Sequence, residues 1–465
     1  MVIDPFKFMS FEEEHHLFDR EIIGFHYWQL IRAETYDYIL DIQLNHKDRH
    51  PDLVEGKKPR FGNALKLLGF SIRHGFNKVS KNKILLSARS TRRNKQVDLT
   101  LGLSKKDFVY LNRPVNYEHE IDDTNVEMIY PDFRELIRGL SIVLEQHNKH
   151  LKNIVYKEIK DWLQAFENEF DIKLSKDKIV GMVIYSYTSY RVLFPYFVKK
   201  LSNIQPSKIL VSPYYERFNL ILIKAAKELK IQVIEYQHGE ISKYHIAYNY
   251  LQIHEEYLPD VFLFFGEYWK DTIVFPDKKR ILVTGSLTLD DIVKNKKSLS
   301  RINDSTQELL FISQGPFSSF LYPFAVSVAN ALDKEGIDYR IRYKLHPYEV
   351  KTWNLQHPDF NDKRIIIETG NLYDLMACVD YQIGITSTAL FEGIAFRLKT
   401  FIVDCDYLEE SDMKKFCDEG YGLLIRNPDE IVRAIKEGIS QNHAVDYFWK
   451  ENSKKWFKRA LEIKE

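Results

Sequence analysis

Residues 339–350 read YRIRYKLHPYEV and residues 379–403 read VDYQIGITSTALFEGIAFRLKTFIV, and these two stretches decide the fold. The first begins as an alternating strand that must stop at Pro347, because proline has no backbone N–H for a sheet and keeps the preceding residue extended. His346 is therefore expected at the carboxyl end of a strand. The second stretch predicts a buried strand at 381–385 and a helix at 389–396.

Three hydroxyl residues, Thr386, Ser387 and Thr388, separate that strand from that helix. Serine and threonine favour the position just before a helix, where the side-chain oxygen accepts a hydrogen bond from a first-turn N–H group. The N-terminus of a helix also keeps free N–H groups and a partial positive charge. We therefore expect an anion such as a phosphate to bind at this point.

The same alternation of strands and helices extends over most of the chain. Strand patterns occur near 208–212, 231–236, 260–265, 308–313, 339–345, 381–385 and 400–403. Alternation of this kind predicts α/β domains with doubly wound parallel sheets, and 465 residues exceed one ordinary core. The polar run KNKKSLSRINDSTQ at 294–307 is the best linker candidate. We expect an N-terminal domain at 1–295 with helical additions at its start, a second domain at 306–445, and a terminal helix at 446–465.

Composition narrows the class of protein. Hydrophobic residues make up 45% and aromatic residues 14%, which indicates a globular chain. Lys+Arg and Asp+Glu both number 66, so no overall electrostatic attraction to nucleic acid is expected. The three cysteines have neither metal spacing nor the number for a disulfide framework, which favours a reducing compartment. With an acidic N-terminus and no apolar run of about 18 residues, we expect a cytoplasmic protein, at most peripheral at the cytoplasmic membrane.

Two cationic segments have alternative interpretations. The terminal helix, DYFWKENSKKWFKRALEIKE, is expected to pack back on the N-terminal domain through its aromatic residues, and its cations also suit an anionic lipid surface. The sequence ARSTRR at 88–93 follows a predicted strand at 84–87, where open α/β sheets place ligands. The alternative for this loop is simple exposure to water.

Several common catalytic motifs are absent from the sequence. There is no G-x-G-x-x-G after a strand, no G-x-x-x-x-G-K-S/T, no H-E-x-x-H and no G-x-S-x-G. Dinucleotide oxidoreduction, P-loop hydrolysis, zincin proteolysis and serine hydrolysis therefore lose support.

The strand-end motifs carry a resemblance to a known family. Gln237-His238-Gly239 resembles the QHG signature of bacterial capsular and surface-polysaccharide glycosyltransferases. In that family's order follow FISQ at 311–314, KLHP at 344–347, and Thr-Ser-Thr at 386–388 with a Phe-Glu pair just beyond. The resemblance covers about residues 205 to 440, and the His-Pro motif is also similar to that of bacterial sialyltransferases and Kdo transferases. It implies the GT-B fold, two Rossmann-like doubly wound domains facing across a cleft, with the donor on the C-terminal domain and no need of a metal.

The same resemblance assigns donor-binding roles. His346 is expected to contact the donor phosphate or nucleotide, the hydroxyl residues to bind it, and Glu392 to lie near the ribose. Lys344 and the helix N-terminus are expected to stabilise the charge that develops on the leaving nucleotide. The full expected set is Ser313, Gln314, Lys344, His346, Pro347, Thr386, Ser387, Thr388 and Glu392. No metal ligands and no cofactor besides the nucleotide-sugar substrate are expected.

The acceptor hydroxyl needs a general base, and three candidates are Glu216, His238 and Glu240. All three follow strands of the N-terminal domain. Glu216 can instead be a helix first-turn carboxylate favoured by the dipole. His238 can instead be an ordinary loop histidine, although Gly239 suggests a tight backbone site. The choice among the three stays open.

The expected activity is a metal-independent glycosyltransferase that builds capsule, exopolysaccharide or lipopolysaccharide. A CMP-linked sugar acid suits the motifs, and a UDP- or GDP-hexose is the alternative donor. The acceptor is expected to be a glycan or a lipid-linked glycan, with peripheral contact to the inner membrane surface. Two alternatives are a CDP-polyol phosphotransferase of the teichoic-acid type and a non-catalytic GT-B-like assembly subunit.

Overall fold

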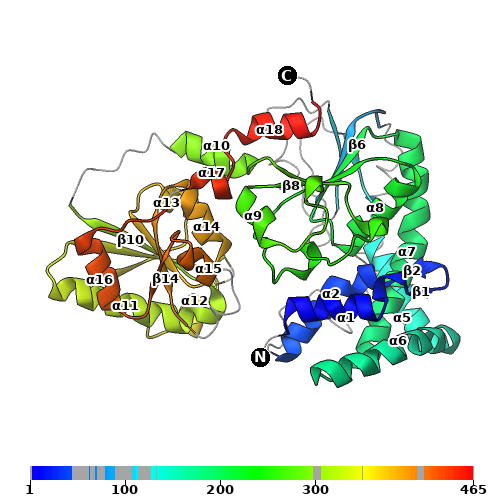
Figure 1. Ribbon diagram of the computed structural model, residues 1–465, viewed down its shortest axis with the longest axis horizontal. Coiled ribbons are helices and arrows are strands. Elements are labelled where there is room, and N and C mark those ends of the chain that lie inside the picture. Colours follow the sequence, from blue (N-terminus) through cyan, green and yellow to red (C-terminus); the bar gives the residue numbers. More distant parts are fainter. Residues whose placement is uncertain are drawn as a thin grey trace. The chain divides into compact units, whose positions relative to one another are not determined.

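The computed structural model describes residues 3–43, 62, 69–70, 79–88, 107–113, 127–131, 133–296, 305–347, 349–405, 413–442 and 444–463. Within these the chain forms two compact units (Figure 1). Unit 1 comprises Met1–Phe264 and Thr272–Leu282, and unit 2 comprises Phe265–Asp271 and Val283–Glu465. The cationic loop at 89–93 and most of the predicted linker lie outside the described residues.

Unit 1 contains a seven-stranded sheet of order β5-β4-β3-β6-β7-β8-β9. The ladders from β5 through β8 are all parallel. Its central strands are apolar and buried, as expected for a parallel sheet whose two faces are covered by helices. The strand order reverses between β3 and β6, which is the topological switch point. The strands are β3 (Ile84–Ala88), β4 (Phe108–Leu111), β5 (Glu127–Ile129), β6 (Lys208–Ser212), β7 (Val233–Tyr236), β8 (Val261–Phe264) and β9 (Ile281–Val283).

Helices pack around this sheet, and two of them form the N-terminal part of the unit. The longest, α7, starts at a Ser175 cap and contacts α5, α6 and α8. A two-stranded antiparallel pair, β1 (Glu21–Ile22) and β2 (Phe25–His26), joins the first two helices. The helices are α1 (Pro5–Glu14), α2 (Trp28–Gln43), α5 (Arg134–His147), α6 (Lys149–Phe170), α7 (Lys176–Ile204) and α8 (Arg217–Glu228).

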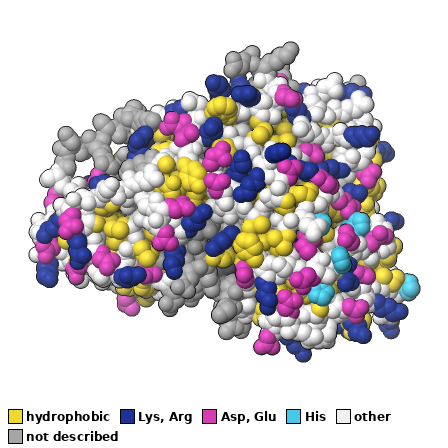
Figure 2. Space-filling model, viewed as in Figure 1, with side chains coloured by type: hydrophobic (Ala, Val, Ile, Leu, Met, Phe, Trp, Pro, Cys, Tyr) yellow, Lys and Arg dark blue, Asp and Glu magenta, His cyan; other side chains and the backbone are white. Residues whose placement is uncertain are grey.

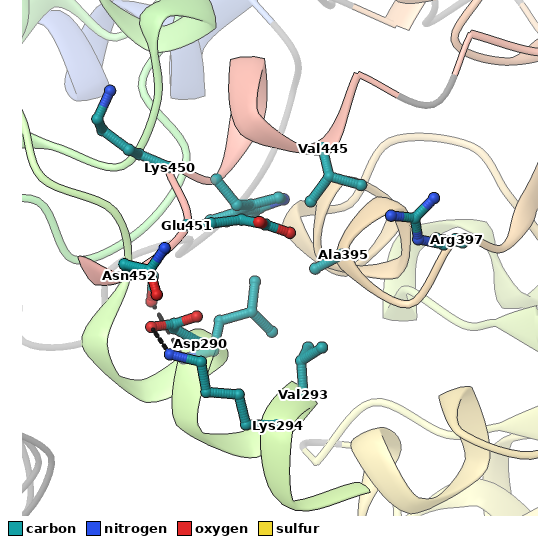
Figure 3. A pocket seen from close by; sticks show the side chains of 12 residues that line it. Asp290, Val293, Lys294, Ala395, Arg397, Val445, Lys450, Glu451 and Asn452 are labelled. Atoms are coloured by element: carbon teal, nitrogen blue, oxygen red, sulfur yellow. Dashed lines mark hydrogen bonds and ion pairs between the residues drawn. The ribbon is translucent and has the colours of Figure 1, made fainter. Parts of the chain in front are cut away.

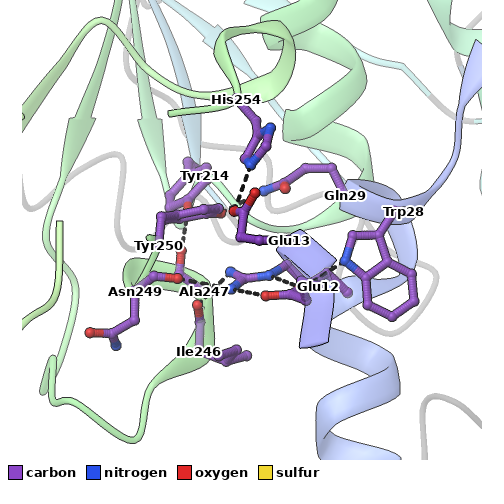
Figure 4. A network of polar contacts seen from close by, with 11 residues as sticks. Glu12, Glu13, Trp28, Gln29, Tyr214, Ile246, Ala247, Asn249, Tyr250 and His254 are labelled. Atoms are coloured by element: carbon purple, nitrogen blue, oxygen red, sulfur yellow. Dashed lines mark hydrogen bonds and ion pairs between the residues drawn. The ribbon is translucent and has the colours of Figure 1, made fainter. Parts of the chain in front are cut away.

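A buried polar network fastens α1 and α2 to the segment after β7 (Figure 4). Arg32 and Glu12, each 1% exposed, form a bidentate pair with N–O distances of 2.6 and 2.7 Å. Arg32 also donates to the carbonyl oxygens of Ile246 and Asn249 at 2.6 and 2.8 Å, and the Trp28 indole donates to Glu12 at 2.6 Å. A buried ion pair is tolerated when its remaining hydrogen-bonding capacity is met in this way. The N-terminal helices are therefore integral to unit 1.

Unit 2 contains a six-stranded parallel sheet of order β12-β11-β10-β13-β14-β15. Here the switch point lies between β10 and β13. The strands are β10 (Gln307–Ile312), β11 (Tyr339–Lys344), β12 (Ile365–Glu368), β13 (Tyr381–Gly384), β14 (Lys399–Val403) and β15 (Leu423–Ile425). The helices before the terminal segment are α9 (Glu267–Thr272), α10 (Leu287–Lys296), α11 (Ser318–Lys334), α12 (Trp353–Gln356), α13 (Leu372–Met376), α14 (Thr388–Ala395), α15 (Met413–Asp418) and α16 (Pro428–Glu437).

The predicted fold class is confirmed as two Rossmann-like, doubly wound α/β domains with parallel sheets. β11, β13 and α14 occupy the places that the two stretches quoted first predict. On the face drawn in Figure 2, basic and acidic side chains of the described residues are intermixed, in keeping with the balanced composition. Of the helices in the described ranges, none has the length and apolar character needed to cross a membrane.

The terminal segment folds with unit 2 as α17 (Val445–Phe448) and α18 (Ser453–Ala460). The Trp269 indole donates to the Phe448 carbonyl oxygen at 2.9 Å, and the Trp449 indole donates to the Phe391 carbonyl oxygen at 2.7 Å. A Cβ atom at Gly266 would lie 2.2 Å from the Tyr447 carbonyl oxygen, so only glycine permits this approach. The terminal segment thus packs on residues 265–271, which precede the predicted linker in sequence but fold with unit 2.

Candidate functional site

The switch point of the unit 2 sheet brings the predicted donor-binding residues to one edge. Lys344 ends β11, Thr388 and Glu392 lie in α14, and the other residues follow β10, β11 or β13. Crevices at the carboxyl ends of such strands bind ligands in doubly wound sheets. Gln314 bridges two of these ends, because its Oε1 accepts the Thr386 N–H at 3.1 Å and its Nε2 lies 3.4 Å from Thr386 Oγ1. The bridge spans β10 and β13, the two strands between which the order reverses.

The N-terminus of α14 has the cap that the sequence predicts. Ser387 is the N-cap, with extended backbone, and its Oγ accepts the Ala389 N–H at 3.3 Å. Thr386 precedes it and Thr388 is the first residue of the helix, so three hydroxyl residues lie at the positive end of the helix dipole, while the Leu390 N–H donates to the Ser387 carbonyl oxygen at 3.0 Å. This arrangement suits an anion.

Two buried residues fix α14 against β13. Gln382 is 0% exposed, and its Nε2 donates to the Leu390 carbonyl oxygen at 2.7 Å and to Thr400 Oγ1 at 2.8 Å. A Cβ atom at Gly393 would lie 2.0 Å from Gln382 Oε1, so glycine is required for the helix to come this close. The position of the capped N-terminus is therefore set by the core of the sheet.

At the end of β11, Lys344 and His346 differ in accessibility. Lys344 is 8% exposed, and its Nζ donates to the Leu345 carbonyl oxygen at 2.7 Å. Burial lowers the pKa of Lys344, while the carboxylates of Glu349 and Glu368 oppose that shift. His346 is partly exposed and Pro347 is exposed, so this turn reaches the surface at the strand end.

Glu349, which the sequence analysis did not single out, organises this turn. Its Oε2 accepts the His346 N–H at 2.7 Å and its Oε1 accepts a hydrogen bond from Ser313 Oγ at 2.9 Å. Glu349 is 5% and Ser313 2% exposed, so the Ser313 hydroxyl is buried and bonded to protein. The spacing H-P-x-E is like that of a capping box, with the Glu349 side chain accepting the N–H of the residue three positions earlier, but here it closes a turn before α12, whose N-cap is Thr352. That spacing is the signal by which Glu349 could have been found.

Glu392 contacts α13 from the second turn of α14. Its Oε1 accepts a hydrogen bond from the Tyr373 hydroxyl at 3.3 Å. Burial raises the pKa of Glu392 to about 7, against the opposing hydrogen bond from Tyr373. Near neutral pH this carboxyl can therefore either donate to or accept from a ligand hydroxyl.

In unit 1, Glu216 lies at the switch point in an ion pair. It is the N-cap of α8 but makes no side-chain cap bond, and its Oε2 accepts from Arg113 Nη1 at 2.7 Å. Arg113 also donates to the Ala88 carbonyl oxygen at 3.3 Å, and its guanidinium lies 4.8 Å from the centre of the Phe218 ring. Arg113 links the ends of β4, β3 and α8, and no feature of the sequence indicated it.

His238 and Glu240 lie in the loop after β7, beside the end of β6. His238 Nε2 is 3.4 Å from the hydroxyl of Tyr215, the residue before Glu216. Gln237 is 0% exposed and donates to the Gly239 carbonyl oxygen at 2.7 Å, which shapes the loop. The suggestion that Gly239 marks a tight backbone site is wrong, because a Cβ atom there would meet nothing within 4 Å in the described structure. Glu240 is partly exposed.

A buried acid lies in β7, three residues before His238. Glu235 is 0% exposed, and its Oε1 accepts from the Tyr248 hydroxyl at 2.6 Å and from the Tyr214 N–H at 3.3 Å. Its Oε2 has no hydrogen-bond partner among the described residues. Burial raises the pKa of Glu235 to about 8, so at neutral pH the carboxyl holds a proton.

A pocket of about 90 Å³ also lies in unit 2, at the end of α14 away from its cap (Figure 3). It is lined by α10, Ala395, Arg397 and the segment 445–452. Asp290 in its wall already bonds Ser453 Oγ and Lys294 Nζ, each at 2.9 Å. All the predicted donor-binding residues are described, and none of them lines this pocket.

Metal independence stays a prediction. Among the described residues no group of three or more His, Cys, Asp or Glu side chains is placed to hold a metal ion. The sequence does contain an Asp-x-Asp spacing at 404–406. Asp404 pairs with Arg426 at 3.1 Å, and the second aspartate is outside the described part of the chain.

Comparisons with known proteins give only distant structural likeness. No protein-family model matches the chain, and no curated protein matches its sequence. UDP-GlcNAc 2-epimerase from Methanocaldococcus jannaschii is 13% identical, with 83% of this chain and 100% of that chain covered and a TM-score of 0.45. MurG from Acinetobacter baumannii is 11% identical, with 82% and 100% covered and a TM-score of 0.47. The wall teichoic acid polymerase TagF is 11% identical, with 95% and 98% covered and a TM-score of 0.44. At these scores we transfer no ligand and no residue role.

Proposed function

We propose that the protein is a glycosyltransferase that binds a nucleotide-activated sugar at the strand ends of unit 2 and transfers the sugar to a glycan acceptor. The observation that carries this proposal is the capped N-terminus of α14, bridged through Gln314 to β10 at the switch point, with His346 at the end of the next strand. The hydroxyl residues and the positive end of the α14 dipole, together with His346, suit an anion at the position where doubly wound sheets bind ligands.

Transfer of the sugar requires the donor site to stabilise the leaving nucleotide. Negative charge develops on its phosphate as the glycosidic bond breaks, and N–H groups of α14, the His346 imidazole and the Lys344 ammonium are the groups that would meet it. Glu392 would face the ribose, accepting or donating a hydrogen bond to its hydroxyls. No metal and no cofactor besides the donor is part of this proposal.

A base on unit 1 would take the acceptor proton. We rank His238 ahead of Glu216, because protonation of Glu216 would forfeit its ion pair with Arg113. The Tyr215 hydroxyl, 3.4 Å from His238 Nε2, would orient the imidazole. Glu240 stays a candidate, since it lies in the same loop.

The donor is proposed to be a CMP-linked sugar acid, and the acceptor a surface polysaccharide such as capsule or lipopolysaccharide, or its lipid-linked precursor. The proposed location is the cytoplasm, with peripheral contact at the membrane. The resemblance of the strand-end motifs supports these finer statements. A CDP-polyol phosphotransferase would differ in its product, a phosphodiester with release of CMP instead of a glycosidic bond with release of a nucleotide.

The test of catalysis is a set of three variants, Glu216→Ala, His238→Ala and Glu240→Ala, each assayed for donor binding and for turnover. We expect His238→Ala to bind donor with unchanged affinity and to lose about 100- to 10,000-fold in kcat, the usual contribution of a general base. Glu216→Ala is expected to lower the free energy of unfolding, because it leaves Arg113 without its carboxylate partner, and to change kcat less than His238→Ala does. Full turnover in all three variants would eliminate the proposed base.

A further inference from the structure

We propose that Glu349 is a positioning residue of the donor site, which holds His346 in its ligand-binding direction by fixing the backbone of the His-Pro turn. The inference rests on the proposed function, since His346 is taken to face the nucleotide.

The carboxylate of Glu349 joins two strand ends. One oxygen accepts the His346 N–H at 2.7 Å, just past the end of β11, and the other accepts from Ser313 Oγ at 2.9 Å, just past the end of β10. Tyr343 donates to Ser313 Oγ at 3.2 Å, which continues the connection into β11. A carboxylate that is only 5% exposed needs such donors, because an unpaired buried charge is costly.

The hydrogen bonds of Glu349 hold the chain just beyond the point where the hydrogen bonds of the sheet end. The β10–β11 ladder ends at the Ile312–Lys344 pair, and Leu345 is still held by its N–H bond to the Glu368 carbonyl oxygen at 3.0 Å. His346 is the next residue, and its N–H bonds to the Glu349 side chain instead of to a neighbouring strand. The direction in which the imidazole leaves the sheet therefore depends on Glu349.

The main chain of the turn supports the same conclusion. The Glu349 N–H donates to the His346 carbonyl oxygen at 2.9 Å, and the Trp353 N–H donates to the Glu349 carbonyl oxygen at 2.8 Å. The turn thus closes on His346 through both main chain and side chain and leads directly into α12. Removing the side chain would leave the His346 N–H without its acceptor while the sheet stays intact.

The experiment measures the affinity of the full-length protein for CMP, CDP, UDP and GDP by titration calorimetry. Glu349→Ala is expected to weaken binding of the nucleotide that the wild type binds by about tenfold, because small displacements of positioned groups have effects of this size or larger. Glu349→Gln is expected to stay within about threefold of the wild type, since its amide oxygen can accept the His346 N–H and its amino group can donate to Ser313 Oγ. Rescue by glutamine identifies geometry, not charge, as the requirement.

Tyr381→Phe is the matched control for loss of stability. It removes another polar contact of a buried residue in the same sheet, the 3.2 Å bond from the Tyr381 hydroxyl to Gln307 Oε1, at the amino end of β13 and so away from the turn. This variant is expected to lower Tm and leave nucleotide affinity unchanged. In a His346→Ala background, Glu349→Ala is expected to cause less than about a twofold further loss, because residues that act as a unit are not additive.

Binding by the wild type, His346→Ala and Glu349→Ala distinguishes failure of this inference from failure of the proposed function. If the wild type binds a nucleotide and His346→Ala weakens that binding, but Glu349→Ala binds like the wild type, Glu349 has no positioning role and the proposed function stands. Equal losses of affinity in Glu349→Ala and Tyr381→Phe would also overturn the inference, because they would show a general effect of destabilisation. If the wild type binds none of the four nucleotides, both proposals are overturned.

Discussion

Replacing His346 with alanine is expected to weaken nucleotide binding by about 10- to 100-fold while the protein stays folded. A hydrogen bond to a charged group contributes about 1.5–3 kcal/mol, and each 1.4 kcal/mol is about tenfold in affinity. His346 is partly exposed at the strand end, and its backbone N–H would keep its bond to Glu349 in the variant, so the turn should persist. Calorimetric titration with each nucleotide, with far-UV circular dichroism as the folding check, measures both parts.

The matched control for this variant is His357→Ala, in the same unit. His357 Nε2 lies 3.0 Å from Ser318 Oγ, and its ring stacks on Phe360 with centroids 4.6 Å apart, so it has structural contacts only. We expect a small loss of stability and unchanged nucleotide affinity. Equal affinities of wild type and His346→Ala for every nucleotide would remove His346 from the donor site.

Replacing Glu235 with glutamine is expected to make the protein more stable at alkaline pH. The pKa of Glu235 is about 8 in the folded protein and 4.5 ordinarily, so between these values the folded state holds a proton that the unfolded state has released. The contribution of Glu235 to the free energy of unfolding is therefore fully present below about pH 4.5 and is lost as pH rises through about 8. At about 1.36 kcal/mol per pKa unit, the shift from 4.5 to about 8 sets an upper limit of about 5 kcal/mol on this loss of stability.

The variant should lack this loss. The glutamine oxygen can accept from Tyr248 and Tyr214 as Glu235 Oε1 does, so the packing need not change. Urea unfolding of both proteins at pH 5, 7 and 9 measures the effect. As pH rises, the unfolding free energy of the variant should increase relative to that of the wild type. Glu255→Gln is the control of opposite sign, because Arg280 lowers the pKa of Glu255. Parallel pH profiles of wild type and Glu235→Gln would contradict the buried, protonated state.

The sequence predicted the parts of unit 2 that depend on local pattern. Alternation up to Lys344 and the proline after His346 mark β11 and its end, and the hydroxyl run before Ala389 marks the cap of α14. These features depend on residues close together in the chain. Sequence reasoning therefore placed the candidate donor residues on the correct elements.

Other features depend on contacts between distant residues and gave no local signal. Arg113 reaches Glu216 only because β4, β3 and β6 are adjacent in the sheet. The assignment of residues 265–271 to unit 2 depends on Trp269 and Gly266 meeting the terminal segment. Glu349 is different, since the H-P-x-E spacing was visible and its likeness to a capping box was missed.

Nucleotide binding by unit 2 is tested most directly by thermal unfolding of the full-length protein with CMP, CDP, UDP and GDP. A ligand at 100 times its Kd stabilises the native state by about 2.7 kcal/mol, which corresponds to a rise of several degrees in Tm. We predict that at least one of the four, with CMP the first expectation, raises Tm in the wild type and that His346→Ala reduces the rise at the same concentration. If none of the four raises Tm at millimolar concentration, the strand ends of unit 2 are not a nucleotide site.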